Sequence, residues 1–217
     1  MRFVKKTLIY ILVAIPLILL LNYLKVEGPA AIVIIFLTFL AATLGPLFYT
    51  ILGTRNLAKI ERFLLANRNI PSYYINYTVA HRLDDEFEEM MGKLLKQYKQ
   101  KNKQALFKTL RAHYNKDIQS AAQEIELIQP MEYRYYYQAY YYIERREFTE
   151  AHDHINRISK AWMKLALLSY IELKQGNRPR AIELAEEAMQ AARGVQLYVM
   201  VKTFEREYLE LRQQAVK

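Results

Sequence analysis

Two long apolar runs near the N-terminus constrain the fold more than any other feature of this 217-residue sequence. No charged residue occurs in residues 7–24 or in residues 30–52. Each run approaches the roughly 20 residues that an α-helix needs to cross a hydrocarbon core about 30 Å thick. The sequence therefore predicts two transmembrane helices, joined as a hairpin within residues 1–53.

A cleavable signal peptide is the alternative interpretation of the first run, because the basic segment MRFVKK precedes it. No cleavage site with small residues follows the run, and only the short connection KVEGP separates it from the second run. Both observations favour a helix that stays in the membrane over a signal peptide that is removed.

Basic residues near the ends of the two runs predict the orientation of the hairpin. They are Arg2, Lys5 and Lys6 before the first run and Arg55, Lys59, Arg62 and Arg68 after the second, against Lys25 and Glu27 in the connection. Lysine and arginine accumulate on the cytoplasmic side of membrane helices, so both termini are predicted to be cytoplasmic. Neither run contains an ionisable Asp, Glu, Lys or Arg, which favours anchoring over ion transport.

One sequence pattern repeats four times after the hairpin, at nearly regular intervals. Its reference positions, small or flexible residues on the second of two helices, are Met90, Ala121, Ala151 and Ala181. At a fixed distance before them lie the small residues Thr78, Thr109, Ala139 and Ser169, and closer to them the turn positions Asp85, Lys116, Arg146 and Gly176. Small residues let two helices approach closely, so each repeat is predicted to be a helix, a turn and a second helix.

The repeat resembles the tetratricopeptide family in YRYYYQAYYYIERREFTEAHDHI and in ALLSYIELKQGNRPRAIELAEEAMQAA. The resemblance covers residues 71–193 and implies an all-α fold, a solenoid of about four stacked helix pairs. The period is shorter than the one typical of that family. Residues 54–70 are predicted to form a basic helix next to the membrane, and residues 194–217 a helix that caps the last pair.

Seven tyrosines lie in the ten positions from Tyr133 to Tyr142. Tyr135 and Tyr142 fall on the face that packs on the second helix of the same pair, while Tyr137 and Tyr141 face an adjacent pair. The remaining stripe lines the concave groove that the resemblance implies. The predicted partner-binding groove residues are Tyr133, Tyr136, Tyr140, Glu144, Tyr114, Tyr170, Lys174 and Lys103. The alternative is that all these tyrosines serve helix packing.

A basic segment from residue 90 to residue 116 contains no acidic residue, in a chain whose net charge is +9. Such a segment suits anionic lipid headgroups, RNA or an acidic peptide; the alternative is a solvated helix end. The candidates for contact with an anionic surface are Lys93, Lys96, Lys99 and Lys101. No nucleic-acid-binding module is recognisable, so a nucleic-acid partner is not expected.

The sequence contains no motif that is typical of a catalytic site. The chain has no cysteine, no phosphate-binding glycine loop and no nucleophile elbow. His152 and His154 lie two positions apart on a predicted helix and therefore point to divergent faces, which predicts solvated histidines rather than a metal pair. His81 and His113 are isolated. We expect no enzyme activity, no catalytic or metal-binding residue and no cofactor.

The sequence supports two hypotheses about the function of this protein. The first is a membrane-anchored cytoplasmic adaptor or scaffold, whose tyrosine-rich groove binds a protein or peptide. The second is an accessory or regulatory subunit that binds another membrane protein through the hairpin. The identity of the partner, the biological process and the oligomeric state are not encoded in any recognisable pattern.

Overall fold

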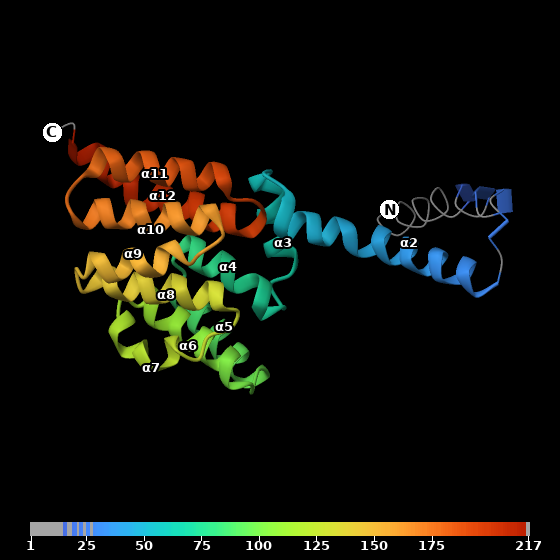
Figure 1. Cartoon of the computed structure of the whole chain (residues 1–217), viewed down its shortest axis with the longest axis horizontal. Helices are drawn as coiled ribbons and strands as arrows, with labels where there is room; N and C mark the ends of the chain where they lie inside the picture. Colours follow the sequence, from blue (N-terminus) through green and yellow to red (C-terminus); the bar gives the residue numbers. More distant parts are fainter. Residues whose placement is uncertain (1–14, 17–18, 21, 24, 27, 216–217) are drawn as a thin grey trace. The chain divides into compact units, whose positions relative to one another are not determined.

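The computed structural model describes residues 15–16, 19–20, 22–23, 25–26 and 28–215, with the side chains of 207–215 left out. The chain divides into two compact units, Met1–Thr54 and Arg55–Lys217. Helices make up most of the described residues, and no strand occurs among them (Figure 1). The predicted all-α fold is confirmed for this part of the chain.

The first unit contains one long apolar helix among its described residues. Helix α2 (Pro29–Phe48) continues into a π-helical turn, η1 (Tyr49–Gly53). Together they span 25 residues, and the most apolar 18-residue window within them has a mean hydropathy of 2.4 and contains no buried residue. Membrane spans and signal sequences share this length and composition. The other predicted span, residues 7–24, falls mostly outside the described residues.

The threonines of this helix form their hydrogen bonds within the helix itself. The hydroxyls of Thr38, Thr43 and Thr50 each donate a hydrogen bond of 2.8 Å to a carbonyl of the preceding helical turn. Gly53 closes the π-helical turn at a point where a Cβ atom would lie 2.9 Å from a ring carbon of Tyr49. A segment whose polar groups are satisfied internally suits a hydrocarbon environment.

The second unit consists of helices that pack in pairs. Its elements are α3 (Leu57–Ala66), α4 (Pro71–His81), α5 (Asp84–Gln97), α6 (Lys101–Tyr114), the 3₁₀ turn η2 (Ile118–Ala121), α7 (Ala122–Ile125), α8 (Met131–Glu144), α9 (Phe148–Asn156), α10 (Ala161–Lys174), α11 (Arg178–Ala191) and α12 (Gly194–Ala215). Helix α4 packs on α5, α6 on η2 and α7, α8 on α9, and α10 on α11. The predicted paired packing is confirmed.

The same turn closes the first helix of every pair. Arg82, Lys116, Arg146 and Gly176 adopt positive φ angles of 54°, 58°, 61° and 86°. The residue after each of them donates its N–H to a carbonyl in the last turn of the helix: Leu83 to Thr78, Asp117 to Ala112, Glu147 to Tyr142 and Asn177 to Glu172, at 2.9–3.0 Å. These hydrogen bonds and the left-handed residue form a Schellman motif, which satisfies carbonyls at a helix end.

The first of these turns lies earlier than predicted. The sequence pattern placed it at Asp85, but the left-handed residue is Arg82, and α5 already begins at Asp84. The interval from Arg82 to Lys116 is therefore longer than the two later intervals, which end at Arg146 and Gly176 and are equal. A longer first pair explains why a uniform period misplaces its turn.

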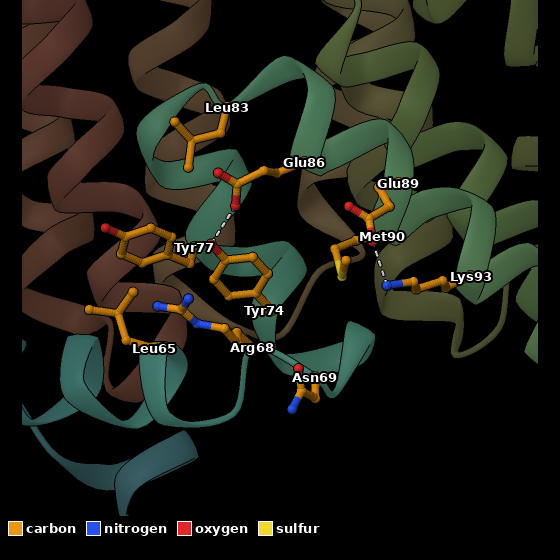
Figure 2. Close-up of a pocket in the computed structure, with 10 residues that line it drawn as sticks. All are labelled: Leu65, Arg68, Asn69, Tyr74, Tyr77, Leu83, Glu86, Glu89, Met90 and Lys93. Carbon is orange, nitrogen blue, oxygen red and sulfur yellow. Dashed lines mark hydrogen bonds and ion pairs between the residues drawn. The ribbon is translucent and has the colours of Figure 1, made fainter.

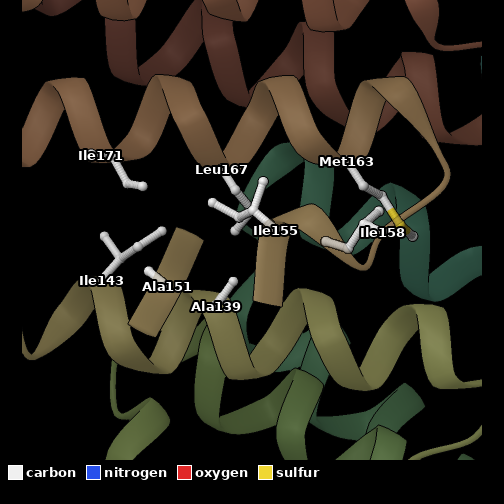
Figure 3. Packing of buried hydrophobic residues seen from close by; sticks show 8 residues of the cluster. All are labelled: Ala139, Ile143, Ala151, Ile155, Ile158, Met163, Leu167 and Ile171. Carbon is white, nitrogen blue, oxygen red and sulfur yellow. The ribbon is translucent and has the colours of Figure 1, made fainter. Parts of the chain in front are cut away.

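Small residues sit where the two helices of a pair approach each other. Ala139 of α8 and Ala151 of α9 are both 0% exposed and lie in one cluster with Ile143, Ile155 and Leu167 (Figure 3). The other predicted small positions, Thr78, Thr109 and Ser169, are buried as well. Because the helices approach closely at these points, a larger side chain there would displace one helix of the pair.

Helix α12 connects the two ends of the second unit. It packs against α11, which precedes it, but more extensively against α4 and also against α3. Tyr198 of α12 is 0% exposed, and Arg206 donates a hydrogen bond of 2.9 Å to the carbonyl of Ala80 in α4. The sequence predicted a cap on the last pair alone, so the contact with α3 and α4 is a finding of the structure.

Candidate partner-binding face

The tyrosines of α8 divide by their position on the helix. Tyr137 is 7% exposed and packs with Ala105 and Ile118 of the preceding pair, as the helical spacing predicted. Tyr135 and Tyr142, predicted as core, are half-buried beside α9. Helix α8 therefore presents rings to both neighbours, with several rings that keep part of their surface in water.

Tyr140 joins three successive helix pairs through its ring. It stacks on Tyr170 of α10 with a centroid distance of 5.1 Å and an interplanar angle of 7°, and the two hydroxyl oxygens lie 3.4 Å apart. The ring of His113 from α6 meets the Tyr140 ring edge-on, with a centroid distance of 4.3 Å. The helices α6, α8 and α10 thus share one row of rings, and α8 packs against α10.

An ion pair lies beside this row. The ammonium of Lys174 is 2.8 Å from the carboxylate of Glu144, which also accepts a hydrogen bond from the Tyr170 hydroxyl. Burial opposes ionisation of Glu144, but the hydrogen bonds from Lys174 and Tyr170 outweigh it and lower its pKa. Burial is the main cause that raises the pKa of Tyr170, and the neighbouring Tyr140 and Glu144 raise it further. The face therefore carries an ionised Glu144 and a protonated Tyr170 at neutral pH.

His113 is part of this face, although the sequence showed it only as an isolated histidine. Burial chiefly lowers its pKa to about 4; Glu144 opposes the shift and Arg82 adds to it. The ring is therefore neutral at physiological pH and packs against Tyr137 and Tyr140. Its place one helical turn after the small position Thr109, on the first helix of its repeat, was the available signal.

The structure brings together Tyr140, Glu144, Tyr170 and Lys174, which the sequence placed in one groove. Tyr133 and Tyr136 are half-buried on α8, and Lys160 lies over the ring of Tyr133 at 5.2 Å. Tyr136 meets Tyr137 edge-on, with a centroid distance of 5.4 Å.

Tyr114 and Lys103 occupy other surroundings. Tyr114 is 5% exposed, stacks on Phe87 with a centroid distance of 3.7 Å and donates a hydrogen bond of 2.6 Å to Asp84. Arg82 lies 3.9 Å above its ring. Lys103 is exposed and lies over the ring of Tyr98 at 4.5 Å.

The predicted basic surface is exposed around the connection between α5 and α6. Lys93 pairs with Glu89 at 2.5 Å. Lys96, Lys99 and Lys101 are exposed and form no ion pair with any residue that the structure describes. These three ammonium groups therefore remain available to an anionic surface.

Both histidines of α9 were predicted to be solvated. His152 is exposed, but the prediction is wrong for His154. The ring of His154 is half-buried and stacks on Tyr142 at 5.3 Å, with an interplanar angle of 11°. Burial and Arg157 lower its pKa. The aromatic neighbour on α8 explains the difference, because an isolated α9 would leave this ring in water. Among the described residues, no cluster of three or more acidic, histidine or cysteine side chains could hold a metal ion.

The fold and this face define the class of the protein: within the residues that the structure describes, it is an all-helical protein with paired helices, a half-buried tyrosine row and one exposed apolar helix. Comparison with protein-family models, with curated proteins and with solved structures finds no match to the chain.

Proposed function

We propose that this protein is a membrane-anchored cytoplasmic adaptor that holds a protein or peptide partner on the tyrosine row of α8. The second unit would then be a tetratricopeptide-like α-solenoid, with residues 71–193 as its repeats. The observation that carries the proposal is the row formed by His113, Tyr140 and Tyr170. It crosses three helix pairs and keeps part of its ring surface in water.

Tyrosines of this kind suit recognition. A half-buried ring is already held in place by its neighbours, so binding costs little side-chain entropy, while its remaining surface adds apolar contact and a hydroxyl. Beside the rings, Glu144 and Lys174 are 25% and 30% exposed, which offers both charges to a partner. The mixture favours a peptide or protein surface over a purely apolar ligand.

The anchor in this proposal is a hairpin of two spans, residues 7–24 and 30–52, with both termini in the cytoplasm. The exposed apolar surface of α2 supports the second span. Positive charge on both flanks supports the orientation. Lys96, Lys99 and Lys101 would add contact with anionic lipid headgroups, which attract clustered lysines.

Photocrosslinking in cells tests the partner-binding face. A benzoylphenylalanine at Tyr136 in the full chain should crosslink one protein reproducibly, and Tyr140→Ala in the same chain should abolish that crosslink. The matched control carries the same crosslinker at the exposed position His152 on α9. It should not capture the protein that is captured from Tyr136. Identical crosslinks from Tyr136 and His152, or a crosslink that survives Tyr140→Ala, would exclude this face as the binding surface.

The exposed surface of α2 favours a second candidate, an accessory subunit that packs against another membrane protein. Ile32 and Phe36 are 69% and 61% exposed on this helix. A crosslinker at Phe36 that captures a membrane protein, unaffected by Tyr140→Ala, would support this candidate. Under the adaptor proposal, Phe36 should label lipid or a second copy of the hairpin instead.

A further inference from the structure

A pocket of about 500 Å³ opens between α3, α4 and α5, apart from the tyrosine row of α8 (Figure 2). Leu65, Leu83 and Met90 contribute apolar walls. The rings of Tyr74 and Tyr77 stack beside them, with a centroid distance of 5.5 Å and an interplanar angle of 11°. The pocket is broadly open to solvent, so a molecule bound in it would keep part of its surface in water.

Two opposite charges in this pocket have no counter-ion of their own among the described residues. Glu89 and Lys93 neutralise each other at 2.5 Å. Glu86 is half-buried and accepts a hydrogen bond from the Tyr74 hydroxyl, but no described cation lies within ion-pair distance of it. The guanidinium of Arg68 forms neither an ion pair nor a hydrogen bond with the described residues, and Figure 2 shows its side chain extending toward the two tyrosines.

Both charges act on the same ring. Burial and the hydrogen bond to Glu86 raise the pKa of Tyr74 to about 12, and the positive charge of Arg68 opposes them. Tyr74 therefore stays protonated, and its hydrogen bond keeps Glu86 oriented toward the pocket. A ligand with a single charge would neutralise either Glu86 or Arg68 and leave the other without a counter-ion.

We propose that this pocket binds a small amphipathic zwitterion, with its ammonium at Glu86 and its oxyanion at Arg68. The faces of Tyr74 and Tyr77 favour a cation, and a guanidinium binds a carboxylate or a phosphate through paired hydrogen bonds. The apolar walls accommodate an aliphatic portion. Short peptides and phosphoethanolamine headgroups both have this chemistry.

Calorimetry on the full chain in a maltoside detergent tests the assignment with defined probes. The probes are the dipeptide Leu-Leu, its N-acetyl form, its C-amide form and glycerophosphoethanolamine. We expect a zwitterion to bind with roughly millimolar affinity, and removal of either charge from the dipeptide to weaken binding about tenfold. Binding of glycerophosphoethanolamine in preference to Leu-Leu would support the site and assign its ligand to lipid headgroups.

Matched variants separate the two ends of the ligand. Glu86→Gln should weaken binding of Leu-Leu, and this variant should bind the N-acetyl dipeptide no more weakly than Leu-Leu itself. Arg68→Gln should likewise weaken binding of Leu-Leu and no longer distinguish it from the C-amide dipeptide. Glu88→Gln and Arg62→Gln are the controls, since Glu88 pairs with Arg111 at 2.7 Å and Arg62 is exposed on α3 outside the pocket lining. Thermal melting confirms that each variant folds.

Three results would overturn the proposal. One is the absence of binding by both zwitterionic probes at concentrations tenfold above about 1 mM. Another is equal binding of the dipeptide and its singly charged forms, which would indicate an apolar pocket. The last is an equal effect of the pocket variants and the control variants on affinity, because the charges of Glu86 and Arg68 would then play no specific part.

Discussion

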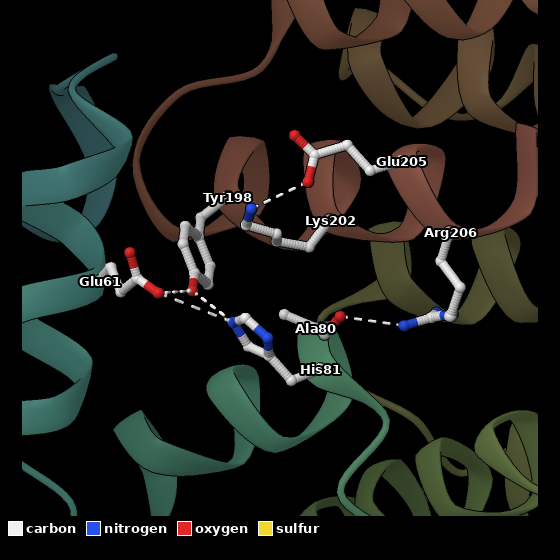
Figure 4. A network of polar contacts seen from close by, with 7 residues as sticks. All are labelled: Glu61, Ala80, His81, Tyr198, Lys202, Glu205 and Arg206. Atoms are coloured by element: carbon white, nitrogen blue, oxygen red, sulfur yellow. Dashed lines mark hydrogen bonds and ion pairs between the residues drawn. The ribbon is translucent and has the colours of Figure 1, made fainter. Parts of the chain in front are cut away.

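The hydroxyl of Tyr198 lies 2.7 Å from Nε2 of His81, although 117 positions separate the two in the sequence (Figure 4). The same hydroxyl donates to Glu61 at 3.2 Å, so it accepts its other hydrogen bond from the Nε2–H tautomer of His81. These residues come from α12, α4 and α3. One buried ring therefore ties the last helix of the second unit to the first two.

Tyr198→Ala should destabilise the second unit strongly. The ring is 0% exposed. Removing a buried aromatic side chain costs about 3 to 5 kcal/mol of unfolding free energy. Tyr198→Phe keeps the ring and loses only the hydroxyl, so it should cost about 1 kcal/mol. Urea unfolding of the full chain, followed by the fluorescence of Trp162, measures both.

The outcome also tests cooperativity along the unit. If α12 holds the ends together, Tyr198→Ala should lower the unfolding midpoint for the whole unit in a single transition. Circular dichroism reports the loss of helix throughout the unit, so a partial loss of helix signal at lower urea than the Trp162 transition would show that this contact does not couple the two ends.

Ala139→Leu should destabilise the α8–α9 pair. Ala139 and Ala151 are both 0% exposed where these helices meet, so the larger leucine side chain must displace backbone. Overpacking of this kind costs about 1 to 3 kcal/mol. Ala161→Leu, at an exposed position at the start of α10, is the control and should change stability by less than about 0.5 kcal/mol. Equal effects from the two changes would mean that close approach at Ala139 is unimportant.

Local spacing predicted much of the helical framework. The interval between the small residues Ala139 and Ser169 equals the interval between the turns at Arg146 and Gly176, and each pair of positions occupies equivalent places in the structure. Such spacing is readable because each helix pair is a local unit with its own turn. The first turn, at Arg82, was misplaced because its pair is longer.

Local spacing could not predict contacts between helices that lie far apart in the sequence. The contact between Tyr198 and His81 depends on where α12 turns back toward α4, and no local period encodes that path. The row through His113 and the stack of His154 on Tyr142 were missed for a related reason. A lone histidine shows its surroundings only after neighbouring helices are placed.

The burial of His113 predicts that stability depends on pH. An unfolded histidine has a pKa near 6.5, and burial lowers that of His113 to about 4. Between these values the unfolded state binds more protons, so the contribution of neutral His113 is complete above about pH 6.5 and is lost as pH falls toward about 4. Thermal melting of the full chain between pH 7.5 and 4.5 should show this decrease.

His113→Phe separates this effect from other titrations. Phenylalanine keeps a flat neutral ring against Tyr140 and cannot be protonated, so part of the decrease in melting temperature below pH 6.5 should disappear. Some decrease should remain, because burial also lowers the pKa of His81 and of His154. His152→Phe, at an exposed position, is the control. An unchanged pH profile in His113→Phe would show that this histidine does not titrate in the window.

Tyr140 and Tyr142 should differ in binding more than in stability. The sequence predicted a core role for Tyr142 and an exposed role for Tyr140, but both rings are half-buried and stacked, Tyr142 on His154 and Tyr140 on Tyr170. Alanine at either position should therefore cost a similar free energy of unfolding, about 1 to 3 kcal/mol. Only Tyr140→Ala should weaken partner binding, by roughly 2 kcal/mol if the ring is a hot spot.

Tyr140→Phe is the control that distinguishes the ring from the hydroxyl. The Tyr140 hydroxyl contacts the Tyr170 hydroxyl at a long 3.4 Å and also interacts with the Glu144 carboxylate, so its loss should cost about 1 kcal/mol of unfolding free energy, less than loss of the whole ring. Partner capture by the full chain should then depend on the Tyr140 ring. Tyr140→Phe and Tyr142→Ala should still capture the partner, and Tyr140→Ala should not. Capture that falls equally in the two alanine variants would trace the loss to a weakened fold, and the row of α8 would then serve packing alone.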